Sequence, residues 1–282
     1  MTLKSSALEA TFQPGAGMAG TSLRHRGEEL LHGDGIPLLY PWANRLAGFE
    51  YAALGERVTL ERDSTLIELD QNGLPIHGLL GAWSDWQVEE AGSELSATLD
   101  FGAYADLLRF FPFPHELRID VQLDGPQLQI TTTVNANQGA AVPVSFGFHP
   151  YFRLPGAPRE EWRIEIPVGE RLLLDDDMIP TGGRQPAGEL DGPLADRSFD
   201  DGFASLVPGR PFALEAAGRR LEVRFDERFP FAQVYSPPGA EFICFEPMTA
   251  PTNALRSGED LPVVEPGETF TAIWTIAISR TG

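Results

Sequence analysis

Cysteine is almost absent from this chain of 282 residues, in which Cys244 is the only one. One cysteine excludes a disulfide within the chain and a zinc-finger framework. Cys244 stands in the apolar run EFICFEP, residues 241–247, where a buried and inert thiol is the usual state of this residue type. We therefore expect Cys244 to belong to the core rather than to act as a nucleophile.

Positive charge is also scarce. The chain has 21 Lys and Arg residues against 41 Asp and Glu residues, a formal net charge of −20. Such a surface repels phosphate backbones and anionic lipid, so we expect no nucleic-acid partner and no membrane partner. No apolar run approaches the ~20 residues that span a bilayer, and no basic start followed by an apolar stretch indicates a secretion signal. These observations predict a cytoplasmic protein.

Several common site motifs are missing as well. The chain has no Gly-rich phosphate loop, no dinucleotide fingerprint and no G-x-S-x-G elbow. His25 and His32 are seven residues apart with no carboxylate pattern around them, which does not suit a metal site. The acidic run 175–177 lacks the glycine and final glutamate of a calcium loop. We expect neither a metal ion nor a cofactor.

What the chain does have is period-2 alternation of apolar and polar residues. One face of residues 268–279 carries Phe270, Ala272, Trp274, Ile276 and Ile278. Residues 86–101, 115–134 and 211–225 each form two such runs around a Gly-containing turn, which is typical of a hairpin. Only residues 103–111 show a helical pattern. We predict an all-β fold, a large antiparallel β-sandwich with few short helices, in one domain covering residues 1–282.

The stretch SFGFHPYF, residues 145–152, contains one of only five histidines. In an extended segment Ser145, Gly147 and His149 share a face, and the two small residues predict free room beside the imidazole. Pro150 keeps His149 out of the helical region of backbone space. A functional histidine and a hydrogen-bonded core histidine both fit this segment taken alone.

A carboxylate ends another buried run. Glu246 follows residues that are apolar on both faces of the expected strand. A buried glutamate raises the free energy of the fold unless it is paired or hydrogen-bonded, and its basicity changes with its surroundings. The alternative is a glutamate at a strand end that turns to solvent.

Two further segments carry polar groups next to aromatic residues. Asn44 and Arg45 lie in an expected turn, where the arginine offers a planar donor fork for hydroxyls, ring oxygens or carboxylates. His77 comes shortly before Trp83 and Trp86. Aromatic rings near polar donors suit a sugar, although a surface arginine and core tryptophans fit the same pattern.

In this order, the segments resemble the aldose 1-epimerase (galactose mutarotase) family. The matching motifs are A-N-R at 43–45, H-G at 77–78, H-P-Y-F at 149–152, D-x-x-F at 200–203 and E-P-x-T…N-A at 246–254. The resemblance implies a mutarotase-type β-sandwich and a cofactor-free isomerase that interconverts the α and β anomers of an aldose. It also implies roles for single residues, namely Glu246 as general base, His149 as general acid, and Arg45, His77, Asp200 and Asn44 as sugar-binding groups, with Asp201 as a rival for Asp200.

Two positions depart from the family pattern. Phe148 and Arg153 stand where many members have asparagine. The H-P-Y-F and E-P-x-T…N-A forms are similar to a bacterial branch that includes hexose-6-phosphate epimerases. The expected partner is therefore a monosaccharide, either an aldohexose or its 6-phosphate, and Arg153 either contacts the phosphate or faces solvent.

Two other functions remain open at this level. A non-catalytic carbohydrate-binding or sugar-sensing protein would keep Arg45 and the aromatic residues without needing both His149 and Glu246. A glycoside hydrolase would need a second carboxylate about 5–10 Å from the first, which Asp200 or Asp201 would supply. The anomerase hypothesis requires an imidazole and a carboxylate on opposite sides of a single cavity wide enough for a monosaccharide.

Overall fold

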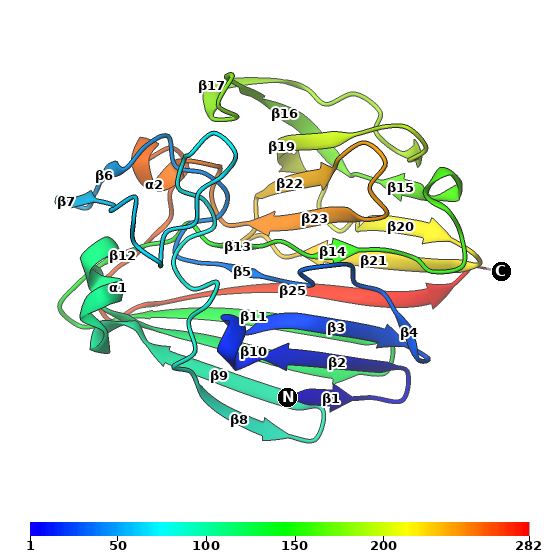
Figure 1. Cartoon of the computed structure of the whole chain (residues 1–282), viewed down its shortest axis with the longest axis horizontal. Coiled ribbons are helices and arrows are strands. Elements are labelled where there is room, and N and C mark those ends of the chain that lie inside the picture. Colours follow the sequence, from blue (N-terminus) through cyan, green and yellow to red (C-terminus); the bar gives the residue numbers. More distant parts are fainter. Residues whose placement is uncertain (282) are drawn as a thin grey trace.

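The computed structural model describes residues 1–281, and two large antiparallel sheets dominate them (Figure 1). In order across the first, nine-stranded sheet lie β18 (Gly192–Pro193), β15 (Arg163–Glu165), β20 (Phe212–Ala216), β21 (Arg219–Phe225), β25 (Thr269–Arg280), β11 (Gln127–Ala136), β10 (His115–Asp124), β9 (Glu94–Asp100) and β8 (Gln87–Ala91). The second, eight-stranded sheet has β17 (Pro180–Pro186), β16 (Val168–Leu174), β19 (Phe199–Leu206), β22 (Phe231–Ser236), β23 (Ile243–Met248), β13 (Gly147–Phe148) and β5 (Leu38–Leu39), with β14 (Tyr151–Phe152) also paired to β23.

Smaller elements complete the fold. A four-stranded sheet contains β1 (Thr2–Lys4), β2 (Leu8–Gln13), β3 (Ala19–His25) and β4 (Glu28–Glu29), and two strand pairs join β12 (Val142–Pro143) to β24 (Val263–Val264) and β6 (Glu50–Ala53) to β7 (Glu56–Thr59). Within residues 1–281 the helices are α1 (Ala105–Phe110), α2 (Ala254–Ser257) and the short 3₁₀ turns η1 (Pro14–Ala16), η2 (Phe101–Ala103) and η3 (Arg159–Glu161). The predicted all-β sandwich with few short helices is confirmed.

The hairpins lie where the alternation predicted them. Strands β10 and β11 pair out to Asp124 and Gln127, which leaves a two-residue turn in which Gly125 adopts a positive φ of 52°. Pairs β8–β9 and β20–β21 close in the same way around Gly92 and Gly218. Local alternation and turn residues therefore explain most of the nine-stranded sheet.

The core lies between the two large sheets. The five inward residues of β25 are at most 7% exposed. Aromatic contacts connect the layers: the rings of Phe148 and Trp274 lie 5.2 Å apart, and those of Phe212 and Phe245 lie 5.5 Å apart. Aromatic rings packed between the two sheets bury large apolar areas, and this burial is the main contribution to the stability of a β-sandwich.

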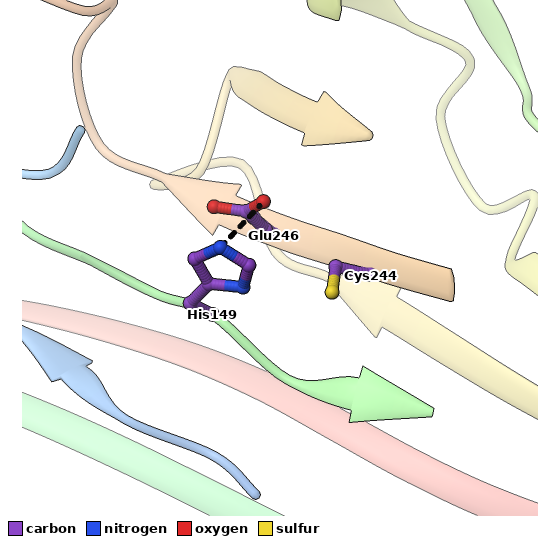
Figure 2. Close-up of side chains that lie close together, drawn as sticks. All are labelled: His149, Cys244 and Glu246. Atoms are coloured by element: carbon purple, nitrogen blue, oxygen red, sulfur yellow. Dashed lines mark ion pairs between the residues drawn. The ribbon is translucent and has the colours of Figure 1, made fainter. Parts of the chain in front are cut away.

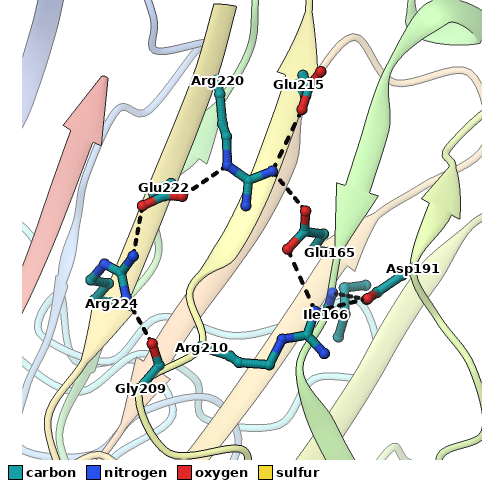
Figure 3. A network of polar contacts seen from close by, with 9 residues as sticks. All are labelled: Glu165, Ile166, Asp191, Gly209, Arg210, Glu215, Arg220, Glu222 and Arg224. Carbon is teal, nitrogen blue, oxygen red and sulfur yellow. Dashed lines mark hydrogen bonds and ion pairs between the residues drawn. The ribbon is translucent and has the colours of Figure 1, made fainter. Parts of the chain in front are cut away.

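Arginine–carboxylate pairs cover part of the nine-stranded sheet (Figure 3). Arg220 contacts Glu165 at 2.7 Å and Glu222 at 2.8 Å, and Arg210 contacts Asp191 at 3.0 Å. Every arginine in this network is matched by carboxylates, so the network offers no free cation to an anionic ligand. Exposed pairs of this kind contribute only ~0–1 kcal/mol each. No helix within residues 1–281 is long and apolar enough to cross a membrane.

Candidate active site

One cavity collects all six residues that the sequence singled out. It has a volume of about 190 Å³ and is lined by Asn44, Arg45, Gln71, Ile76, His77, His149, Tyr151, Asp200, Gln233, Tyr235 and Glu246. These residues come from separate parts of the chain, namely the loops after β5 and β7, the link between β13 and β14 that holds His149, and the strands β14, β19, β22 and β23. The tertiary fold therefore brings the expected acid, base and sugar-binding groups to one place.

His149 and Glu246 lie next to each other (Figure 2), and we call them the acid–base pair. The Nε2 atom of His149 is 3.5 Å from Oε1 of Glu246. The expectation that they face each other from opposite sides of the cavity is wrong, because this distance leaves no space for a sugar between them. Two adjacent groups still suit the expected chemistry, because the anomeric hydroxyl and the ring oxygen of an aldose are bonded to the same carbon.

Backbone pairing explains why the pair meets. Gly147 of β13 lies opposite Met248 of β23, which aligns the two segments just before His149 and just after Glu246. Thr249 extends this alignment, because its amide and its hydroxyl both donate to the carbonyl of Phe146, at 3.0 and 3.1 Å. The threonine of the E-P-x-T motif thus holds the two strands in register.

The predicted free room beside the imidazole is absent. A Cβ on Gly147 would lie 2.5 Å from the carbonyl oxygen of Pro247, and Ser145 is buried and accepts a hydrogen bond from the Ala43 amide at 2.6 Å. The small residues serve close packing of neighbouring backbone segments instead. Space for a ligand next to His149 belongs to the cavity, which neither Ser145 nor Gly147 lines.

Arg45 is a buried residue, not a surface one. Its Nε donates to Asp70 at 2.6 Å, and its Nη1 donates to the side-chain oxygen of Asn44 at 3.1 Å. Although burial raises the pKa of Asp70, hydrogen bonds from the Leu74 amide and from Arg45 bring it below its usual value. The guanidinium therefore enters the cavity already oriented by two side chains.

The remaining motif residues support this loop. The amide of Asn253 donates to the carbonyl of Arg45 at 3.0 Å, and its side-chain oxygen accepts from the Ala47 amide at 2.9 Å. Gly78 has a positive φ of 78°, and a Cβ there would lie 2.1 Å from the carbonyl oxygen of Tyr40. The N-A and H-G motifs are thus explained by backbone geometry around the cavity.

Asp200 and Asp201 point in different directions. Asp200 lines the cavity and accepts a hydrogen bond from Gln233 Nε2 at 2.7 Å. Asp201 is directed to the other face of β19, where it lies 3.3 Å from Arg171. Of the two, only Asp200 is in a position to contact a ligand in this cavity.

Burial controls the protonation of the acid–base pair. It lowers the pKa of His149 well below 6.5, with further lowering by His77 and Arg45. It raises the pKa of Glu246 well above 4.5, with Asp200 acting in the same direction. Three atoms of the pair, namely both carboxylate oxygens of Glu246 and Nδ1 of His149, have no hydrogen-bond partner among the described residues. Burial therefore disfavours the charged form of each group. The polar contacts of the pair are its own 3.5 Å approach and the Tyr151 hydroxyl, 3.4 Å from Nε2 of His149.

His77 lies beside the pair, with its ring centroid 5.4 Å from that of His149. Burial and Arg45 lower the pKa of His77 to about 4, so it is a neutral imidazole at neutral pH. A neutral ring can both donate and accept hydrogen bonds, which suits sugar hydroxyls.

The sequence-based set lacked five cavity residues, namely the apolar Ile76 and four with polar side chains, Gln71, Gln233, Tyr151 and Tyr235. Gln233 and Tyr235 alternate on one face of β22, and Gln233 lies opposite Glu246, so strand alternation was the signal that pointed to them. Tyr151 belongs to the H-P-Y-F motif, and its ring stacks on His149 at 4.4 Å. Gln71 has no such signal.

The small cavity adjoins a larger one of about 860 Å³. Both are lined by His77, His149 and Tyr151. Among the described residues that line either cavity, the single Lys or Arg is Arg45, whereas Asp34 and Glu68 add negative charge to the larger one. Arg153 lines neither cavity.

Three other residues, His115, Trp83 and Trp86, have packing roles. His115 is fully buried, stacks on Phe101 at 4.6 Å and contacts the Tyr40 hydroxyl. Trp86 is buried, and Trp83 packs on Tyr104 with ring centroids 4.9 Å apart. Neither tryptophan lines the two cavities.

The fold and the site place this chain among mutarotase-like β-sandwich proteins. Similar solved structures include a galactose mutarotase-like protein of Clostridium acetobutylicum, with a TM-score of 0.87, 17% identity and coverage of 99% of this chain and 95% of that one. Another is galactose 1-epimerase of Lactobacillus acidophilus NCFM, with a TM-score of 0.76, 16% identity and coverage of 100% and 94%. At these identities the likeness concerns the fold.

Sequence comparison defines the family. The protein YihR of Escherichia coli (strain K12) is 27% identical in an alignment 271 residues long that covers 90% of this chain and 84% of that protein. A family model described as aldose 1-epimerase matches residues 11–277. The chain belongs to the aldose 1-epimerase family.

Proposed function

We propose that this protein interconverts the α and β anomers of an aldose by acid–base opening and reclosure of the sugar ring. The observation that carries the proposal is the acid–base pair, in which an imidazole and a carboxylate meet 3.5 Å apart in a cavity wall and the carboxylate oxygens accept no hydrogen bond from residues 1–281. Family membership supports an epimerase in general.

The reaction uses the one proton that the pair holds. In the first step this proton passes from Glu246 to His149; the Glu246 carboxylate then takes the proton of the anomeric hydroxyl while the imidazolium protonates the ring oxygen. The bond between the anomeric carbon and the ring oxygen breaks, and an open-chain aldehyde forms. Rotation about C1–C2 exposes the other carbonyl face, and closure returns both protons to their donors. The positive charge of Arg45 favours the ionised form of Glu246.

We propose a neutral aldose rather than its 6-phosphate as the substrate. Arg45 is already paired with Asp70, and the other charged residues that line the described cavities are acidic. A phosphate would meet repulsion of roughly 1–4 kcal/mol per charge at close range. We expect kcat/KM for a free aldohexose to exceed that for its 6-phosphate by at least ~10-fold.

Saturation-transfer NMR of anomer exchange tests these proposals. The assay compares the wild type with His149→Ala, and with His32→Ala as a matched control, since His32 is half-buried and lines neither cavity. We expect exchange to slow by at least ~10² in His149→Ala and to stay unchanged in His32→Ala. Full activity of folded His149→Ala would refute the acid assignment.

Sugar-binding and aryl-glycoside assays on the same protein separate the alternative functions. Sugar binding without accelerated exchange would favour a carbohydrate-binding protein. Release of free sugar from an aryl glycoside would favour glycoside cleavage, for which Asp200 and Glu246 line the same cavity. A panel of aldohexoses and their 6-phosphates, assayed in parallel, tests the preference for a neutral substrate.

A further inference from the structure

A thiol lies beside the acid–base pair (Figure 2). Cys244 and Glu246 are two residues apart on β23, so their side chains project from the same face of the sheet. The cross-strand neighbours of Cys244 are Tyr151 on β14 and Tyr235 on β22, two residues of the cavity wall. The single cysteine of the chain therefore sits beneath the cavity and not elsewhere in the core.

The three side chains converge. One imidazole nitrogen of His149, the sulfur of Cys244 and a carboxylate oxygen of Glu246 lie within 4.8 Å of one another. All three residues are at most 7% exposed. In the described part of the chain the carboxylate oxygens and the imidazole Nδ1 lack hydrogen-bond partners, and Cys244 is a free thiol. Three buried side chains thus bring their ligand atoms together, and the Tyr151 hydroxyl, 3.4 Å from Nε2 of His149, is a further polar neighbour.

We propose that His149, Cys244 and Glu246 bind a borderline-soft divalent cation, for which Zn²⁺ is the best match, and that the bound ion blocks the active site. Imidazole, thiolate and carboxylate are the three donor types that zinc accepts, and three protein ligands with one open position are typical of accessible zinc sites. A thiolate ligand disfavours Mg²⁺ and Ca²⁺, which prefer oxygen.

The geometry requires only small movements. Zinc–ligand bonds of ~2.0–2.3 Å place the ligand atoms of a tetrahedral site about 3.5 Å apart. The pair already meets this spacing at 3.5 Å, so any further contraction falls on the thiol, whose sulfur lies within 4.8 Å of the other two ligand atoms. Binding releases the thiol proton and any proton on the carboxyl group to solvent, and the resulting two negative charges match the charge of the ion.

The consequence for activity rests on the proposed function. A zinc ion on the pair occupies the imidazole nitrogen and the carboxylate oxygen that ring opening needs. Zinc and sugar therefore exclude each other, and zinc acts as an inhibitor that competes with the aldose. The ion enters through the cavity, where His149 and Glu246 are exposed to its interior.

Binding is tested on the purified full chain, freed of metal and kept reduced. Isothermal titration with ZnCl₂ is expected to show one zinc site in the wild type. The zinc affinity of Cys244→Ser is expected to be at least ~10²-fold lower, because even changes outside the ligand shell reduce metal affinity ~10–100-fold. His32→Gln is the matched control, a histidine outside the set that packs on Phe242, and is expected to bind zinc like the wild type. Equal zinc binding by Cys244→Ser would overturn the site.

Cobalt binding to the wild type provides a second test, which does not require Cys244→Ser to fold. Co²⁺ bound to the wild type is expected to show a thiolate-to-cobalt charge-transfer band together with the visible bands of tetrahedral cobalt. A cobalt complex without the thiolate band overturns the proposal.

Anomer-exchange assays complete the test. We expect zinc to inhibit the wild type competitively, a chelator to restore activity, and Cys244→Ser to keep its activity at zinc concentrations that inhibit the wild type. Zinc-insensitive exchange by the wild type would refute the inhibitory site and leave the proposed function intact. Cysteine-dependent zinc binding by a protein that exchanges no anomers would support the metal site and refute the proposed function.

Discussion

Replacing Glu246 by glutamine separates the catalytic from the structural consequences of this buried carboxylate. Glu246 is 1% exposed, and its carboxylate oxygens have no hydrogen-bond partner among residues 1–281. Glutamine has nearly the same shape but neither takes a proton from a hydroxyl nor carries charge. A properly placed general base contributes ~10²–10⁴-fold, which corresponds to a rise of about 3–5 kcal/mol in the activation free energy.

The same substitution is expected to stabilise the fold at alkaline pH. Burial, and then Asp200, raise the pKa of Glu246 above 4.5. A carboxyl group with a raised folded-state pKa contributes stability below the unfolded-state pKa and loses it as pH rises toward the folded-state pKa. Glutamine does not titrate, so the variant gains on the wild type from about pH 4.5 upward. An unsatisfied buried polar group lowers the stability by ~1–3 kcal/mol, and a charged one by more. We therefore expect the free energy of unfolding of Glu246→Gln at alkaline pH to exceed that of the wild type by about 1 kcal/mol or more, which raises Tm by ~2 °C.

Two measurements check this reasoning. Saturation-transfer NMR with a free aldohexose gives the exchange rate, and thermal unfolding in acidic and mildly alkaline buffers gives the stability difference. Glu241→Gln is the matched control, because Glu241 is exposed and precedes the same strand. Wild-type activity of Glu246→Gln would refute the base assignment. A variant that is less stable than the wild type throughout the pH range would show that the buried carboxylate has partners in solution.

Four other outcomes are expected. Asp200→Asn raises KM at least ~10-fold while Asp201→Asn changes it less than ~2-fold, because a lost hydrogen bond to a charged group is worth ~1.5–3 kcal/mol; steady-state kinetics of both variants checks this. Asp70→Asn lowers the free energy of unfolding by about 3 kcal/mol, as expected for a broken buried ion pair, and raises KM because Arg45 loses its orientation; urea unfolding and kinetics that match the wild type would contradict it. The acid limb of the pH profile of kcat/KM lies below pH 6.5, because burial lowers the pKa of the His149 imidazole; an acid limb above that value would contradict it. Cys244, whose thiol pKa burial raises, reacts with an aromatic disulfide reagent only after unfolding, and rapid reaction of the native protein would show that the thiol is open to solvent.

The amino-acid sequence by itself determined the class of fold and most of the residues at the site. Period-2 alternation and turn glycines are local signals, and they predicted the hairpins of the nine-stranded sheet because a strand buries one face whatever its partner is. The motifs around Arg45, His77, His149, Asp200 and Glu246 were visible for the same reason, since each is a short segment with polar groups among apolar ones.

Only the tertiary structure decided how these segments meet. In the structure Asp200 and Gln233 line the cavity, whereas Asp201 contacts Arg171. Gly147 permits close backbone packing, and the thiol of Cys244 lies beside the acid–base pair. Such relations depend on the register between strands far apart in the chain. That register is fixed by packing across both sheets and by bonds such as those from Thr249 to Phe146, which no local pattern of residues contains.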